Sequence, residues 1–151
     1  MSIFAPIYQG VEDLFGWYNS DYGLIFDYLY DNGGYDKFGW TMVLVPMVIV
    51  ALFYFVLKYP YAKKWHWGLM ILISSVVVFG LTMNFANIEL LSPQNDELME
   101  ALSNQESGYQ DFAETLPFKY SMLNSVLSII VGFLASLAAK PFSKCQMHLP
   151  F

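Results

Sequence analysis

The chain has no arginine, only one cysteine and long stretches without any charged residue. A single cysteine, Cys145, excludes an intrachain disulfide. His148 follows it at the spacing Cys-x-x-His, but a structural metal site needs about four ligands and the sequence offers no second pair. A catalytic Cys–His pair is equally weak, because nothing around these residues would orient it. We therefore expect no metal, no cofactor and no enzymatic activity.

Charge is missing from three stretches: 38–57, 65–88 and 120–139, of 20, 24 and 20 residues. A helix rises about 1.5 Å per residue, so each stretch can cross the roughly 30 Å hydrocarbon core of a bilayer. A soluble protein would have to bury three such helices under few polar residues, which the length rule argues against. We predict three transmembrane helices, at 38–57, 67–86 and 120–139.

The charged residues are sorted by sign between these stretches. All thirteen carboxylates lie in 1–37 and 89–119, and five of the seven lysines lie in 58–64 and 140–144. Short lysine-rich loops stay in the cytoplasm, which predicts an N-out/C-in topology. The predicted segments outside the membrane are an acidic aromatic N-terminal tail (1–37, outside), a basic loop (58–66, cytoplasmic), an acidic loop (87–119, outside) and a basic tail (140–151, cytoplasmic).

The composition also suggests a host. The lack of arginine, with much Phe, Tyr, Ile, Asn and Lys, is typical of a low-GC bacterial genome. No segment with a basic start and a long apolar run opens the sequence as a signal peptide would. We therefore expect an integral protein of the bacterial inner membrane, whose acidic tail is translocated with the first span.

The acidic segments predict short helices on the outer side. Leu24, Ile25, Tyr28 and Leu29 share one face of a helix over 21–30, and a second helical piece is expected over 11–18. Ser92 followed by Pro93 predicts the start of a helix in the acidic loop. Glu12 and Asp13 are expected to be exposed. The predicted fold class is all-α: three transmembrane helices with short amphipathic or interfacial helices on the outer side.

The third predicted span carries a stripe of small residues at spacings of three and four. Its members are Ser121, Ser125, Ser128, Gly132, Ala135, Ser136 and Ala139, with Asn124 beside them. Small side chains let helix backbones approach closely, and such packing drives helix association in lipid. The stripe predicts either packing against the other two spans or a contact between subunits, including the lining of a pore. Three spans make a thin bundle, which favours oligomerisation.

Two further features of the spans bear on function. Pro46 lies near the middle of the first span and predicts either a structural kink or a hinge. No Asp, Glu, Lys, Arg or His lies at membrane depth, which argues against a proton pump or ion-coupled carrier. A passive pore stays open, because Ser, Asn, Gly and backbone groups can line one.

Two functional hypotheses follow. The first is a non-enzymatic small integral membrane protein that self-assembles into a homo-oligomer, a pore or channel-like ring with carboxylates at its outer mouth. The second is a membrane anchor or accessory subunit of a larger complex, such as secretion, injection or defence machinery. Its protein partner would dock at the N-terminal tail or at 141–151. In both cases the surrounding partner is the lipid bilayer, and no nucleic acid is expected.

Overall fold

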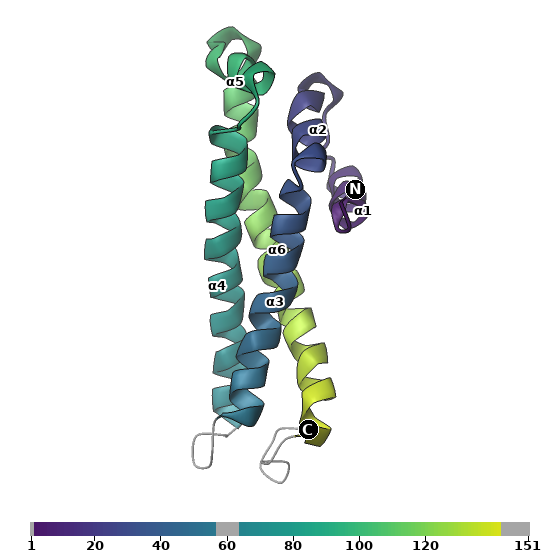
Figure 1. The fold of residues 1–151 in the computed structure, drawn as a ribbon, viewed down its shortest axis with the longest axis vertical. Helices are drawn as coiled ribbons and strands as arrows, with labels where there is room; N and C mark the ends of the chain where they lie inside the picture. The colour runs from purple at the N-terminus through teal and green to yellow at the C-terminus, as the bar shows by residue number, and fades with distance from the viewer. Residues whose placement is uncertain (1, 57–63, 143–151) are drawn as a thin grey trace. The chain divides into compact units, whose positions relative to one another are not determined.

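The computed structural model describes residues 2–56 and 64–142, and no β-strand occurs in these two ranges. Six α-helices follow one another along them (Figure 1): α1 (Ala5–Phe15), α2 (Gly23–Asp31), α3 (Gly34–Phe55), α4 (Lys64–Leu91), α5 (Asp96–Ser103) and α6 (Tyr109–Ala139). Short 3-10 turns stand at Ser20–Tyr22, Gln105–Ser107 and Lys140–Phe142. The predicted all-α class is confirmed for this part of the chain. Lys58, Lys63, Lys144, Cys145 and His148 lie outside the described residues.

Helices α3, α4 and α6 are long and apolar enough to cross a membrane, which indicates a membrane protein. All three extend further than the predicted spans at one end or both, and α3 begins at Gly34 instead of 38. α4 continues through Asn84 and Asn87, and α6 begins at Tyr109 and runs through Pro117. A proline inside a helix removes one backbone donor. Here the neighbouring Leu116 is fully buried, so packing holds this part of α6 in place.

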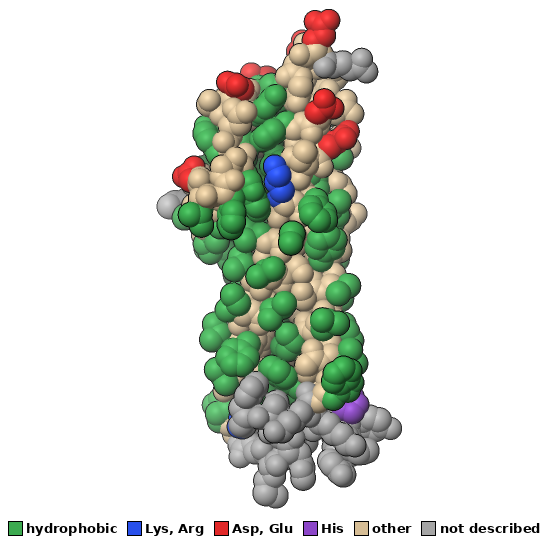
Figure 2. All heavy atoms as spheres, turned by 180° about the vertical axis from the view of Figure 1, so that it is seen from behind, with side chains coloured by type: hydrophobic (Ala, Val, Ile, Leu, Met, Phe, Trp, Pro, Cys, Tyr) green, Lys and Arg blue, Asp and Glu red, His purple; other side chains and the backbone are tan. Residues whose placement is uncertain are grey.

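The chain divides into two compact units, and the division follows charge. One unit, 1–40 with 82–121, contains all thirteen carboxylates and two lysines; we call it the acidic unit. The other, 41–81 with 122–151, contains five lysines and no carboxylate; we call it the basic unit. In the view of Figure 2 the carboxylates appear only on surface formed by the acidic unit. Each unit is described by itself below.

Helices α1 and α2 belong to the acidic unit. α1 begins at Ala5, earlier than the predicted piece over 11–18, and ends at Gly16, whose φ of 64° is the left-handed conformation that glycine accepts without strain. The predicted apolar face of α2 is confirmed in that Ile25, Tyr28 and Leu29 are buried. The Tyr28 hydroxyl accepts a hydrogen bond from the backbone N–H of Gln94 at 3.0 Å. α2 therefore packs on protein.

The start of α5 differs from the prediction. Ser92 and Pro93 do not open this helix: Asn95 is its N-cap, and the Asn95 side chain accepts hydrogen bonds from the N–H groups of Glu97 and Leu98 at 2.9 and 3.3 Å. The reason is the length of α4, since the Ser92 N–H still bonds to the carbonyl of Ile88 at 3.2 Å. Leu98 is buried on the packed face of α5.

The basic unit has its own small core. Val50, Phe53, Tyr54 and Ile71 form it, and Trp67, Met70, Ala135 and Ala139 pack against it. Many other aliphatic side chains of this unit are exposed, among them Leu44, Leu72 and Ile130. An exposed aliphatic surface on long uncharged helices is what a lipid environment requires.

Candidate functional site

Helix α1 is fixed to the first turns of α3 at its N-terminal end. The Asp36 carboxylate accepts three hydrogen bonds there, from the Ser2 hydroxyl at 2.8 Å and from the N–H groups of Ile3 and Phe4 at 2.8 and 3.0 Å. These bonds satisfy N–H groups at the helix start that have no partner within the helix. The start of α1 therefore has a defined position on α3.

The Phe4 ring lies directly on the backbone of α3 at Gly39. A Cβ added to Gly39 would lie 2.1 Å from Cγ of Phe4, so only glycine fits at this position. The same ring meets Trp40 edge to face, with 5.3 Å between the ring centroids. Such aromatic pairs add to the stabilisation gained from burial.

At the other end of α1, Glu12 is buried with only 1% of its surface exposed. One oxygen of its carboxyl group accepts hydrogen bonds from the Tyr35 hydroxyl, at 2.9 Å, and from the Tyr120 hydroxyl. Burial raises the pKa of Glu12, and the neighbouring Asp13 carboxylate adds to this, while the two tyrosine hydrogen bonds act in the opposite direction. Tyr8, one turn earlier, stacks on Tyr35.

The expectation that Glu12 is exposed is wrong. Ala5, Tyr8 and Glu12 are spaced by three and four residues, so they share the face of α1 that is buried. Asp13 is exposed as expected. The burial of Glu12 depends on tyrosines 23 and 108 residues away in the chain, which no local pattern reveals.

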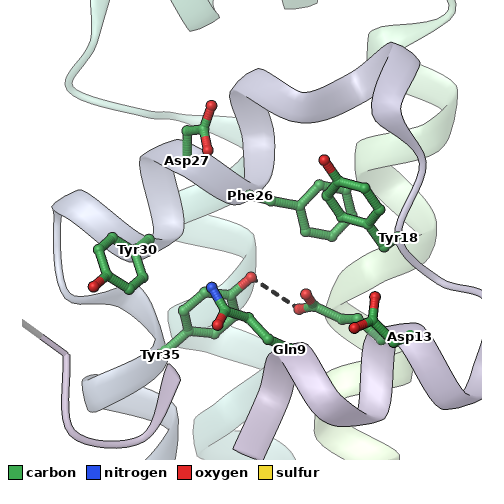
Figure 3. A pocket seen from close by; sticks show the side chains of 8 residues that line it. Gln9, Asp13, Tyr18, Phe26, Asp27, Tyr30 and Tyr35 are labelled. Carbon is green, nitrogen blue, oxygen red and sulfur yellow. Dashed lines mark hydrogen bonds between the residues drawn. The ribbon is translucent and has the colours of Figure 1, made fainter. Parts of the chain in front are cut away.

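A pocket of about 440 Å³ opens beside this buried carboxyl group (Figure 3). Its lining comes from α1, from the segment after it, from α2 and from the start of α3: Gln9, Glu12, Asp13, Tyr18, Phe26, Asp27, Tyr30 and Tyr35. Three of these residues are acids and no lysine is among them. Neither Asp13 nor Asp27 forms an ion pair within the described ranges. The pocket therefore has a negative potential that favours cations.

The lining also decides which kind of cation fits. Among the described residues no group of His, Cys, Asp and Glu side chains is arranged to hold a metal ion. Four aromatic rings line the pocket instead, and aromatic faces attract ammonium groups. A volume of about 440 Å³ lies in the range of small-ligand pockets. The arrangement suits an organic cation.

No family model, no curated protein and no solved structure matches this chain. The geometry of the acidic unit is therefore the basis for a functional proposal. The N-terminal tail is rich in acids and aromatic residues, which is a usable sequence signal for this pocket. It could not tell which of them face one cavity, because that depends on how α1 docks on α3.

No residue of the small-residue stripe of α6 lines this pocket, and most of the stripe belongs to the basic unit. The Ser75 hydroxyl lies 2.6 Å from that of Ser125, and the indole N–H of Trp67 donates to the Ser136 hydroxyl at 3.1 Å. Gly132 is buried against Ile71. These are contacts of helix packing within one chain.

The other predicted residues of the stripe have similar surroundings. Ser121, Ser128 and Ser136 each donate to a backbone carbonyl three or four residues earlier in α6, and Asn124 is buried. Ala135 and Ala139 pack on the core of the basic unit. Pro46, the predicted kink or hinge, lies inside α3, with its Cβ 3.5 Å from where a Cβ of Gly132 would stand.

Proposed function

We propose that this protein is a membrane-anchored accessory subunit whose acidic unit binds an ammonium group. The observation that carries the proposal is the pocket with three carboxylates, four aromatic side chains and no lysine. Glu12 already accepts two tyrosine hydrogen bonds, so Asp13 and Asp27 are the carboxylates proposed to meet the ligand. The proposed role is binding without chemistry.

The proposal includes a placement in the membrane. Helices α3, α4 and α6 are the spans, and the five lysines of the basic unit face the cytoplasm by the positive-inside rule. The acidic unit then faces outward in an N-out/C-in topology, and we propose the bacterial inner membrane as its location. The pocket is thereby open to molecules and protein segments outside the cell membrane.

The ammonium group has two possible sources, a small amine or a lysine side chain of a partner protein. Both offer the same chemistry: a positive charge for Asp13 and Asp27 and an alkyl chain for the rings of Tyr18 and Tyr30. An accessory subunit of a larger complex would use the second source. The experiment below separates the two.

Calorimetric titration of the detergent-solubilised full chain with propylammonium and with a short lysine-containing peptide tests the proposal. We expect saturable binding that weakens as salt is added, because charges near the surface are screened over about 10 Å at 0.1 M salt. Asp13→Asn and Asp27→Asn should each weaken it several-fold. Asp111→Asn is the matched control: it makes the same charge change at an exposed residue of the acidic unit outside the pocket.

The outcomes are distinct. Tighter binding of the peptide than of propylammonium indicates a partner lysine, whereas equal binding indicates a small amine. The proposal is wrong if neither probe saturates, or if the Asp111 variant weakens binding as much as the Asp27 variant does.

Self-assembly into a ring or pore remains a separate prediction. Its main sequence signal was the stripe on α6, and the contacts of Ser125, Gly132 and Ser136 described above use that stripe within one chain. These contacts give no support to a ring. A mass measurement of the particle in mild detergent, corrected for bound detergent, decides between one copy and several.

A further inference from the structure

The side of α1 that does not face the protein is apolar. Ile7 and Leu14 are 45% and 78% exposed, and their spacing of seven residues places them on one side of the helix; Ile3, in the segment before α1, is 70% exposed. Glu12 lies on the buried side. Gln9 is exposed and lies nearly opposite Ile7 around the helix axis. The exposed apolar stripe of α1 therefore carries no charge.

The stripe belongs to a helix that is attached to one end of a candidate membrane span. Asp36 and Gly39 fix the start of α1 to the first turns of α3, which is a candidate membrane span. Phe4 touches Trp40, whose ring is itself half exposed. Tryptophan is enriched where spans enter the headgroup layer. Trp40, at the start of the candidate span, thus contacts Phe4, the residue directly before α1.

We propose that α1 is an interfacial helix, with the stripe of Ile7 and Leu14, and Ile3 just before the helix, inserted at the boundary between headgroups and acyl chains of the outer leaflet. An amphipathic helix lies in this plane when its apolar face is buried in lipid and its other faces meet protein or water. On the protein-facing side of α1, Glu12 and Tyr8 contact Tyr35, and Asp36 of α3 accepts a hydrogen bond from Ser2, as described above. No anionic lipid is required, because the stripe has no lysine to bind one.

Spin labelling of the full chain in phosphatidylcholine vesicles tests this inference. Single cysteines are placed at Ile7, Leu14 and Gln9 in a Cys145→Ser background, and each nitroxide is exposed to oxygen, which partitions into lipid, and to a water-soluble nickel chelate. We expect the oxygen-to-nickel accessibility ratio to be several-fold higher at Ile7→Cys and Leu14→Cys than at Gln9→Cys. All three sites are exposed, so the labels leave the core of the unit intact.

Equal ratios at Ile7, Leu14 and Gln9 would show that the stripe faces water. Low accessibility of the Ile7 and Leu14 labels to both reagents would show that a second copy or another protein covers it. Either result overturns the inference. Circular dichroism of each labelled variant verifies that helix content is kept. The outcome is independent of the ammonium pocket, since a lipid-facing stripe neither requires nor excludes binding on the other side of α1.

Discussion

Replacing Glu12 by alanine removes the acceptor shared by two buried tyrosine hydroxyls. Tyr35 and Tyr120 also hydrogen-bond each other, so without Glu12 one of the two hydroxyls would lie in the interior of the acidic unit with its donor unpaired. An unsatisfied buried polar group costs about 1–3 kcal/mol. This cost falls on the docking of α1, because Glu12 is the residue through which α1 meets both hydroxyls.

Hydrogen exchange of the α1 amides in detergent measures that docking. A loss of about 2 kcal/mol raises the population of the undocked helix by about 30-fold, with the same increase in exchange rate. Asp13→Ala, an exposed neighbour in the same helix, is the control and should change exchange little. If both variants exchange alike, or if Glu12→Ala leaves protection unchanged, the glutamate–tyrosine cluster does not hold α1 in place.

Glu12→Gln isolates the charge, because glutamine keeps an acceptor oxygen for the tyrosines. The pKa of Glu12 is raised in the folded unit, so the folded state binds the proton more tightly than free α1 does. The contribution of Glu12 to docking is then fully present below pH about 4.5, the ordinary value for a glutamate, and is lost as the pH rises through the raised pKa. Glu12→Gln should abolish this dependence in exchange rates corrected for intrinsic chemistry. The groups around Glu12 are Tyr35 of α3, Tyr120 of α6, Asp13 of α1 and Asp27 of α2.

Two glycine substitutions test the packing of each unit. Gly39→Ala forces the Phe4 ring away from α3, and overpacking of this kind costs about 1–3 kcal/mol. The α1 amides should therefore exchange faster in this variant. Gly10→Ala is the control, because a Cβ at Gly10 meets no atom within 4 Å. A result in which both alanine variants behave alike would contradict the close contact. Gly132→Leu pushes into Ile71, whose Cδ1 would lie 2.9 Å from the new Cβ, and should lower the thermal unfolding temperature without changing the mass of the particle. A lower mass would instead show that Gly132 joins two copies.

The sequence predicts the parts of this fold that depend on local composition. Three helices long enough for a membrane were visible because Asp, Glu, Lys and Arg are missing from three stretches, and the face of α2 was visible in the spacing of Ile25, Tyr28 and Leu29. The N-cap of α5 could not be predicted from the sequence, because Ser92 and Asn95 are both good N-cap residues. Which of the two residues caps α5 depends on how far α4 continues, and tertiary packing determines the length of α4.

The candidate site was harder to predict than the helices. A glutamate in a short acidic helix is normally exposed, and only its meeting with Tyr35 and Tyr120 makes its burial tolerable. The small-residue stripe predicts close helix packing, but a sequence pattern does not say whether the second helix belongs to the same chain. Ser75 and Trp67 supply that partner within one chain.

The separation of charge between the two units has an electrical consequence. With the acidic unit outside, a resting potential that is negative inside acts on both groups of charges in the same sense: it attracts the lysines inward and repels the carboxylates outward. Each elementary charge moved across 100 mV is worth about 2.3 kcal/mol. In the proposed N-out/C-in topology the two groups of charges would form a dipole aligned with the field, and an energised cell would resist any inversion of the protein.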